Sequence, residues 1–364
     1  MSKNPNKSLL FIKLAFEEAK INLGSTQLNP SVGCIIEKNG SVISSGRTSI
    51  KGRPHAEFNA LKEKKDFKKA NLYVSLEPCS HFGKTPPCTN KIIKSKIGKV
   101  FFSIHDKDIR TKNSAKKILK QKKIKVFSGL YNSYAKKFYK SYLLQHTNKL
   151  PFVDAKLAIS KDYLTIHKKN KWITNDQSRR VVHLLRSRYD SIVTTVKTIN
   201  FDNPLLNCRI EGLEKKSPAI VVIDRFLKIK KNLKIFNIKR RKIYIVTHSD
   251  NKNKLNYLKK KGVKIIKIKK IQSQQIFLKR TFMNLKKVGL NRIMIESGLT
   301  FLNTALRNNL IENLYLFKTN QNLKSKGYNN APKNYLKKIN LRKFSKINVY
   351  LRDDQLFKIN LKNV

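Results

Sequence analysis

Three side chains near the start of the chain could hold a metal ion. His55, Cys79 and Cys88 offer one imidazole nitrogen and two sulfurs, ligand types that Zn²⁺ prefers. Three protein ligands would leave the fourth tetrahedral position open to water, which is the arrangement of a catalytic zinc site. Glu57 follows His55 by two residues and could move protons without binding the metal. A purely structural zinc site is the alternative, and it would give Glu57 no role.

The chemistry that this cluster predicts is hydrolysis. A zinc ion with an open position lowers the pKa of water from ~15.7 toward ~7 and so supplies hydroxide at neutral pH. Glu57 would take a proton from this water and pass it to a departing amine. His-x-Glu followed by Pro-Cys-x-x-Cys is typical of zinc-dependent nucleobase deaminases. Here eight residues separate Cys79 from Cys88, so the spacing departs from that pattern.

The long spacer resembles one particular family of this superfamily. Residues 80–87 (Ser-His-Phe-Gly-Lys-Thr-Pro-Pro) and 29–34 (Asn-Pro-Ser-Val-Gly-Cys) resemble the N-terminal domain of the bifunctional deaminase/reductases of riboflavin biosynthesis. The resemblance implies a phosphorylated pyrimidine substrate, 2,5-diamino-6-(5-phosphoribosylamino)pyrimidin-4(3H)-one, whose 2-amino group leaves as ammonia. It also implies that Asn29 binds the ring, and that His81 and Lys84 bind the ring or the ribose phosphate.

Alternating helices and strands are predicted around these residues. The expected helices cover 8–23, 55–64, 87–96, 114–121 and 132–145, and the expected strands cover 32–37, 42–47, 71–76, 99–104 and 124–128. Ser8 is the expected N-cap of the first helix, and Asn39-Gly40 predicts a tight turn between two strands. The pattern predicts an α/β/α sandwich around one mixed sheet, which is the cytidine-deaminase-like fold that the resemblance implies. Two helix N-termini would then face the metal.

The second half of the chain begins after a break near residues 146–151. We therefore expect two domains, a deaminase domain at 1–149 and a reductase domain at 150–364. The expected strands cover 152–157, 190–195, 219–224, 242–247, 263–268, 292–296, 314–318 and 347–352, and expected helices include 176–188 and 251–261. Neither Gly-x-Gly-x-x-Gly nor a P-loop occurs, so the pattern alone predicts only an α/β domain with an unassigned ligand.

The second half resembles the dihydrofolate-reductase-like α/β reductase domain of the same family, over residues 156–160, 172–174, 186, 198–209 and 296–298. This implies NADPH as the cofactor and reduction of the ribosyl group to a ribityl chain, giving 5-amino-6-(5-phosphoribitylamino)uracil. The implied NADPH-binding residues are Ala158, Trp172, Thr198, Asp202, Gly298, Leu299, Thr300, Phe301, Leu302, Asn303 and Thr304. The implied substrate-binding residues are Lys156, Asn170, Arg186, Leu206, Arg209 and Glu296. Of these, the two arginines suit a phosphate, because the guanidinium fork matches its geometry.

Two positions depart from the reductase pattern. Tyr163 stands where the family usually has glycine, and a tyrosine there would be strained if the backbone φ were positive. Asn203 replaces one of a pair of aspartates before Pro204, and the loop before Trp172 is short. A deaminase with a degenerate reductase domain is therefore an open alternative.

The net charge of +58, with a pI near 10.3, admits another alternative, a nucleic-acid base deaminase. The lysines are spread over the whole chain, as a Lys-, Asn- and Ile-rich composition bias would produce, and the long cysteine spacer argues against that class. We expect no specific nucleic-acid partner.

Composition also bounds the class of protein. With 364 residues and 40% hydrophobic content, the chain can bury two cores and is not a disordered protein. No segment is apolar enough for a signal peptide or a membrane span, so we expect a cytoplasmic protein without a membrane partner. Cys34 and Cys208 are expected to be buried free thiols. With one ligand cluster we expect one zinc per chain, and we expect a homo-oligomer.

Overall fold

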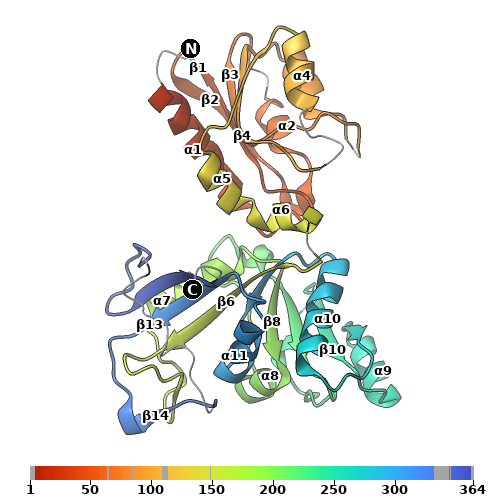
Figure 1. Cartoon of the computed structure of the whole chain (residues 1–364), viewed down its shortest axis with the longest axis vertical. Helices are drawn as coiled ribbons and strands as arrows, with labels where there is room; N and C mark the ends of the chain where they lie inside the picture. Colours follow the sequence, from red (N-terminus) through yellow and green to blue (C-terminus); the bar gives the residue numbers. More distant parts are fainter. Residues whose placement is uncertain are drawn as a thin grey trace. The chain divides into compact units, whose positions relative to one another are not determined.

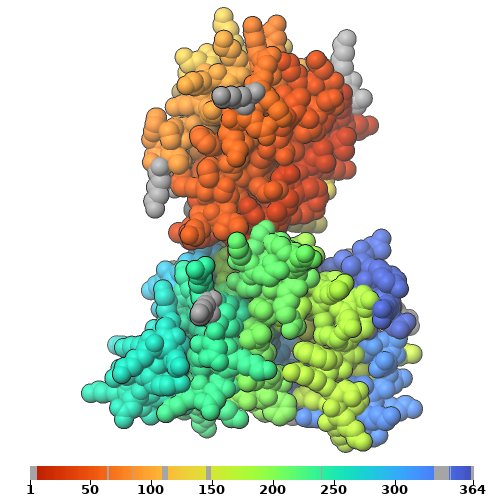
Figure 2. Space-filling model, turned by 180° about the vertical axis from the view of Figure 1, so that it is seen from behind, coloured from red at the N-terminus to blue at the C-terminus, as the bar shows by residue number. Residues whose placement is uncertain are grey.

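The computed structural model describes residues 5–63, 65–83, 85–108, 114–147, 149–238, 240–331, 344 and 346–361. The chain divides into two compact units, Met1–Asn148 and Lys149–Val364. Each unit takes one continuous stretch of sequence, red to yellow for the first and green to blue for the second (Figures 1 and 2). Lys84, a predicted substrate-binding residue, lies outside the described residues. No helix in the described ranges combines the length and apolarity needed to cross a bilayer.

A five-stranded mixed sheet forms the centre of the first unit, in the order β2-β1-β3-β4-β5. Its strands are β1 (Gly33–Lys38), β2 (Ser41–Arg47), β3 (Asn71–Leu76), β4 (Lys99–Ile104) and β5 (Lys125–Ser128). β1 runs antiparallel to both neighbours, whereas β3, β4 and β5 run parallel to one another. Asn39 and Gly40 join β1 to β2 with φ angles of 54° and 89°, which confirms the predicted tight turn.

Helices cover both faces of this sheet (Figure 1). One face carries α1 (Pro5–Ile21) and α5 (Asn132–Phe138), and the other carries α2 (Ala56–Ala60), α3 (Cys88–Lys94) and α4 (Ser114–Gln121). The predicted α/β/α sandwich is therefore confirmed. Two expectations were wrong in detail. The first helix already includes Pro5, so Ser8 is not its N-cap, and the helix expected over 132–145 is broken at Tyr139 before α6 (Lys140–Thr147).

Tyr139 and Gly46 explain how two of these helices are placed. The Tyr139 hydroxyl is anchored in the core at the helix break, 2.6 Å from Ser75 Oγ and 3.2 Å from the Ser31 carbonyl oxygen. Gly46 of β2 lets α2 pack closely, because a Cβ there would lie 2.4 Å from the Ala56 carbonyl oxygen. This close approach brings the start of α2, and with it His55 and Glu57, against the sheet.

The second unit is built on an eight-stranded sheet in the order β11-β10-β9-β8-β12-β6-β13-β15. Its strands are β6 (Phe152–Ile159), β8 (Ser191–Thr195), β9 (Ala219–Ile223), β10 (Ile243–Thr247), β11 (Lys264–Lys267), β12 (Arg292–Ile295), β13 (Asn313–Lys318) and β15 (Gln355–Asn360). All neighbours run parallel except β13 and β15. A separate antiparallel pair joins β7 (Ile166–His167) to β14 (Gly327–Tyr328). Figure 2 shows the segment near residue 160 beside the segment past residue 310, as the β6–β13 pairing requires.

Apolar side chains fill both faces of this sheet. One face is covered by α10 (Gln274–Lys287) and α11 (Leu299–Arg307), which contribute Phe282 and Leu302 to the core. The other face is covered by α7 (Asp176–Arg186), α8 (Val196–Asp202) and α9 (Lys252–Lys260), which contribute Leu185 and Leu258. The strand expected at 347–352 was wrong. The β-strand lies at 355–360, after a turn in which Arg352 has a φ of 53°, because only that segment pairs along the length of β13.

Candidate functional site

The three predicted metal ligands meet at the ends of three elements. His55 is the residue before α2, Cys79 follows β3, and Cys88 begins α3. His55 Nδ1 lies 3.5 Å from Cys79 Sγ and 3.5 Å from Cys88 Sγ, and all three atoms lie within 4.8 Å of one another. Tetrahedral zinc bound to nitrogen at about 2.0 Å and to sulfur at about 2.3 Å separates these atoms by about 3.5 Å. The donor set and its spacing therefore fit a zinc ion.

The surroundings of the cluster favour a thiolate. The Cys88 backbone N–H donates to Cys79 Sγ at 3.3 Å. Hydrogen bonds from the Cys88 thiol and from His55 hold the pKa of Cys79 well below its usual range. The same shared hydrogen bond, together with burial, raises the pKa of Cys88. One sulfur of the pair is thus deprotonated readily, and thiolate is the form that binds metals.

Glu57 sits beside this cluster in the first turn of α2. Its side chain is buried, and burial raises its pKa to about 7. Two neighbours act on it in opposite directions, since the Cys79 thiolate also raises the pKa and His55 lowers it. A carboxyl group with a pKa near neutrality can both accept and release a proton at physiological pH.

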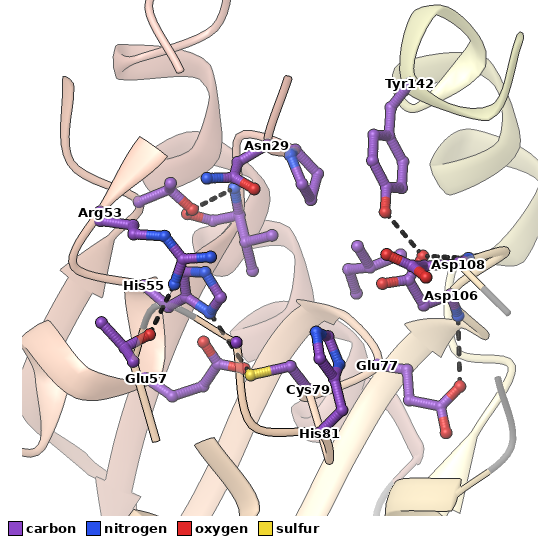
Figure 3. A pocket seen from close by; sticks show the side chains of 16 residues that line it. Asn29, Arg53, His55, Glu57, Glu77, Cys79, His81, Asp106, Asp108 and Tyr142 are labelled. Carbon is purple, nitrogen blue, oxygen red and sulfur yellow. Dashed lines mark hydrogen bonds between the residues drawn. The ribbon is translucent and has the colours of Figure 1, made fainter. Parts of the chain in front are cut away.

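One cavity joins the predicted residues of the first unit. Asn29, His55, Glu57, Cys79 and His81 all line it (Figure 3). The Asn29 amide is held in place by donating to the Gly52 carbonyl oxygen at 3.0 Å. His81 Nδ1 is buried and has no hydrogen-bond partner among the described residues, so its hydrogen-bonding capacity is unused there. The position of Lys84, between two residues that line the cavity, is not described.

An acidic wall of the same cavity was missed from the sequence. Glu77, Asp106, Asp108 and Tyr142 line it, and Asp106 Oδ1 accepts hydrogen bonds from the Tyr142 hydroxyl at 2.8 Å and the Asp108 N–H at 3.0 Å. The Asp106 N–H in turn donates to Glu77 Oε2 at 3.2 Å. The sequence did contain a pattern that could have predicted this wall. Glu77 and Asp106 each follow a strand, and because β3 and β4 are parallel neighbours, their carboxyl ends lie at one edge of the sheet.

In the second unit, three predicted residues come together from three elements: Lys156 within β6, Arg186 at the end of α7 and Glu296 directly after β12. Arg186 Nε donates to Glu296 Oε1 at 2.7 Å, and Arg186 Nη2 donates to Glu296 Oε2 at 2.9 Å. Burial alone would raise the pKa of Glu296, but Arg186 and Lys156 hold it below its ordinary value. Burial also lowers the pKa of Lys156, although Glu296 opposes that shift. The three residues therefore form one buried charged group.

His183, which the sequence analysis did not single out, connects this group to Arg209. Its Nδ1 lies 2.7 Å from the Asn207 carbonyl oxygen, and its Nε2 accepts from Arg209 Nε at 3.1 Å. Burial, and then Arg186, lower the pKa of His183, so the ring is neutral and can accept from Arg209. Trp172 is half-exposed, and its ring lies 5.2 Å from the Arg179 guanidinium carbon.

The predicted cofactor residues lie on a helix N-terminus and a cluster of hydroxyls. Gly298 is the N-cap of α11, and a Cβ added to it would lie 3.0 Å from Asn330 Nδ2, so the glycine lets the Asn330 side chain pack closely against this helix end. Nearby, Thr198 Oγ1 lies 3.3 Å from Ser297 Oγ, and Thr195 Oγ1 is 3.2 Å from both. Backbone N–H groups at a helix end and hydroxyl donors suit phosphate oxygens. This part of the unit therefore offers hydrogen-bond donors that suit the phosphate groups of a cofactor.

The other predicted residues of this half are placed as follows. Residues 299–304 form the first turns of α11, Ala158 lies in β6, and Leu206 is buried with a φ of 49°. Asp202 ends α8 on the surface, and the Asn170 N–H donates to His167 Nδ1 at 2.8 Å. Among the described residues, no hydrogen bond or ion pair links Asn170 or Asp202 to Glu296.

Both departures from the reductase pattern have a positive φ. Tyr163 has a φ of 65°, so a tyrosine occupies a backbone conformation that favours glycine. Its ring packs at the edge of the core, with Lys318 Nζ 4.7 Å from the ring centre. Asn203 has a φ of 43° and caps the end of α8, where asparagine is tolerated well.

Comparisons with known proteins match both halves of the chain. The cytidine and deoxycytidylate deaminase zinc-binding region matches residues 5–104, and the RibD C-terminal domain matches residues 151–319. Riboflavin biosynthesis protein RibD of Aquifex aeolicus is 31% identical over 84% of this chain and 85% of that protein. RibD of Buchnera aphidicola is 34% identical over 85% of this chain and 86% of its own length.

Solved structures of similar proteins cover nearly the whole chain. Acinetobacter baumannii RibD superposes with a TM-score of 0.82 at 26% identity, covering 98% of this chain and 99% of that one. A Thermotoga maritima protein, described as a diaminohydroxyphosphoribosylaminopyrimidine deaminase/5-amino-6-(5-phosphoribosylamino)uracil reductase, gives a TM-score of 0.80 at 26% identity with the same coverage.

Proposed function

Because the chain belongs to the RibD family of riboflavin biosynthesis proteins, we propose a specific pair of reactions for its deaminase and reductase domains. The first removes the 2-amino group of 2,5-diamino-6-(5-phosphoribosylamino)pyrimidin-4(3H)-one as ammonia. The second reduces the ribosyl group of the deaminated product to a ribityl chain. The chain is an enzyme of riboflavin biosynthesis, and its cofactors are Zn²⁺ and NADPH. We propose the residue roles in both reactions as well.

The observation that carries the deaminase assignment is the His55–Cys79–Cys88 cluster with buried Glu57 beside it in one cavity. These three ligands would hold zinc, which when bound supplies the positive charge that makes a water molecule acidic at neutral pH. Glu57 takes the proton of that water and gives it to the departing amine, which its pKa of about 7 permits in both directions. Asn29 and His81 orient the pyrimidine ring against this carboxyl group. Lys84 is proposed to assist from the spacer, on the resemblance alone.

The proposed reductase activity depends on two features of the second unit. These are the charged group of Lys156, Arg186 and Glu296, and the N-terminus of α11. NADPH supplies a hydride when bound, and the start of α11 with Thr198 would hold its phosphates. Lys156, within β6, and Glu296, directly after β12, face the substrate ribose and exchange a proton with it, since their opposite charges interact. Arg209 is exposed, and its hydrogen bond to His183 orients its side chain, so its guanidinium can bind the substrate phosphate. Asn170, Leu206, Trp172, Ala158 and Asp202 complete the proposed binding surfaces.

One experiment tests both halves. Purified, zinc-loaded protein is given the diaminopyrimidinone phosphate, and ammonia release and NADPH oxidation are followed separately. We expect ammonia release without NADPH, and NADPH oxidation once the deaminated product is present. If ammonia appears but NADPH is not oxidised, the second unit is a degenerate domain, an outcome that the positive φ of Tyr163 keeps open. If no ammonia appears, the proposed substrate is wrong.

We further propose that the enzyme acts on its small-molecule substrate in the cytoplasm, as a homo-oligomer and without a nucleic-acid partner. The spread of lysines over the whole sequence supports the last point, because specific recognition needs a concentrated basic surface. Weak RNA binding that disappears steeply with salt would agree with this proposal. Base deamination of RNA or DNA would contradict it, and light scattering tests the assembly.

A further inference from the structure

Arg53 brings a guanidinium group into the deaminase cavity. It lines the cavity together with His55, Glu57 and Cys79, although it is no part of the metal cluster. Arg53 Nη1 donates to the Thr85 hydroxyl at 2.6 Å. Among the residues that the structure describes, this neutral hydroxyl is the acceptor of Arg53, and no carboxylate forms an ion pair with it. The positive charge of Arg53 is therefore not neutralised within the described cavity.

The cavity has opposite charges at its two ends. Arg53 lies on one side of His55 and Cys79, and Asp106 and Asp108 lie on the far side of the same view (Figure 3). Carboxylates accept hydrogen bonds from amino groups and repel phosphate, whereas a guanidinium group attracts phosphate. This polarity would orient a substrate that has amino groups on a ring and a phosphate on its ribose, with the phosphate toward Arg53.

The spacer loop adds donors at the Arg53 end. Thr85 accepts from Arg53 through its hydroxyl oxygen, so its hydroxyl hydrogen is free to point toward a ligand. Gly83 also lines the cavity, and a Cβ placed on it would lie 3.7 Å from Arg53 Nη2 and 3.5 Å from His81 Nε2. Because Gly83 has no side chain, the space between Arg53 and His81 stays open to a group of atoms.

We propose that Arg53, with Thr85, binds the substrate phosphate and makes the deaminase specific for the phosphorylated compound. This inference rests on the proposed function. Arg53 keeps Nη2 and Nε available after its bond to Thr85, and a guanidinium fork can bind two phosphate oxygens at once. A role confined to holding the spacer loop is the competing explanation. It predicts the same loss for every substrate, because loop position does not depend on the phosphate.

The test compares ammonia release from the phosphorylated substrate and from its dephosphorylated riboside, without NADPH. Arg53→Met keeps the length of the side chain and removes the charge, while Arg53→Lys keeps the charge and removes the fork. We expect Arg53→Met to raise KM for the phosphorylated compound about ten- to hundredfold, the effect of losing a charge-assisted hydrogen bond. Arg53→Lys should lie between Arg53→Met and the wild type. With the riboside, both variants should stay within about twofold of the wild type.

A matched control is Arg47→Met in the same unit. Arg47 pairs with Glu18 at 2.8 Å and does not line the cavity, so its KM values should not change. Zinc content is measured in every variant to show that the metal site is intact. Equal losses with both substrates, or no loss with either, would overturn the proposal while leaving the proposed reaction in place. A wild-type protein that deaminates neither compound would overturn both.

Discussion

Arg186 and Glu296 form a two-pronged ion pair, with Nε to Oε1 at 2.7 Å and Nη2 to Oε2 at 2.9 Å. Their side chains are only 13% and 9% exposed, so the pair is held in a largely desolvated place. Arg186 Nη1 donates in addition to the Asn207 carbonyl oxygen at 3.0 Å. Because the fork of Arg186 is occupied by protein groups, Arg209 is the better placed of the two arginines for a substrate phosphate.

The first prediction concerns this pair. Arg186→Met should destabilise the second unit by about 3–5 kcal/mol, because it leaves Glu296 buried without its counter-charge. Arg186→Lys should cost less, since it keeps the charge and loses only the fork. Thermal and denaturant unfolding measure both. A stable Arg186→Met protein whose KM for the reductase substrate rises strongly would instead show that Arg186 serves the substrate.

The second prediction concerns the metal. Cys79→Ser and Cys88→Ser should each lose zinc, from about one ion per chain to almost none, and ammonia release should fall with it. Metal analysis by mass spectrometry and the ammonia assay check this. Cys208→Ala is the control, because Cys208 is a buried thiol of the second unit and no part of the cluster. Full activity in either serine variant would remove the assigned ligands.

The third prediction concerns Glu57. Glu57→Gln keeps the shape of the side chain and all three metal ligands but cannot carry a proton, so kcat should fall about 10²–10⁴-fold. Zinc content should remain at the wild-type level. If zinc is lost in proportion to activity, Glu57 supports the metal site and is not the proton carrier.

The metal ligands and Glu57 were predictable, because the motif itself fixes their residue types. His55, Glu57, Cys79 and Cys88 meet as expected, and the Asn39-Gly40 turn is where the sequence places it. Arg53 was missed, because its approach to the cavity depends on a contact with Thr85, which no local pattern encodes. The acidic wall was missed for a similar reason, because Glu77 and Asp106 come together only where β3 and β4 are neighbours in the sheet.

In the second unit the order of residues resembled a family, but the contacts among them could not be read from spacing. His183 is an ordinary helix residue in the sequence, yet it joins Arg209 to Asn207. Residues 347–352 and 355–360 both mix apolar and polar side chains, so the sequence pattern did not decide which of them forms β15. Pairing with β13 decides it, and that is a property of the assembled sheet.

The fourth prediction is a pH dependence caused by Asp190. Burial raises its pKa from the ordinary 3.8 to about 6, although the backbone N–H groups of Arg292 and Asn291 oppose the rise by donating to its carboxylate. The folded protein therefore favours protonated Asp190. This contribution to stability is complete below pH 4 and is lost as the pH rises through 6.

Asp190→Asn removes this titration and leaves all others in place. Relative to wild type, the variant should gain about 1.5 kcal/mol between pH 5 and pH 8, because only the wild type must then bury a charge. Melting temperatures of both proteins at several pH values measure the difference. A difference that stays constant with pH, or that favours the wild type at high pH, would contradict the assignment to Asp190.

The last prediction concerns the strained tyrosine of the reductase domain. Tyr163 has a φ of 65°, and its N–H donates to the Ser160 carbonyl oxygen at 3.1 Å, so the turn fixes this backbone conformation. Tyr163→Ala keeps the strain and loses the ring, whereas Tyr163→Gly loses the ring and relieves the strain. The glycine variant should therefore be more stable than the alanine variant by about 1 kcal/mol, with both below wild type because the ring packs against the core and Lys318.

The matched control is Asn256, which is exposed in the middle of α9, where the backbone is helical. There Asn256→Gly should be less stable than Asn256→Ala by about 1 kcal/mol, the reverse of the order at residue 163. Denaturant unfolding of the four variants provides the comparison. The same order at both positions would show that the turn at Tyr163 relaxes in solution. In that case, the replacement of glycine would give no reason to doubt the reductase activity.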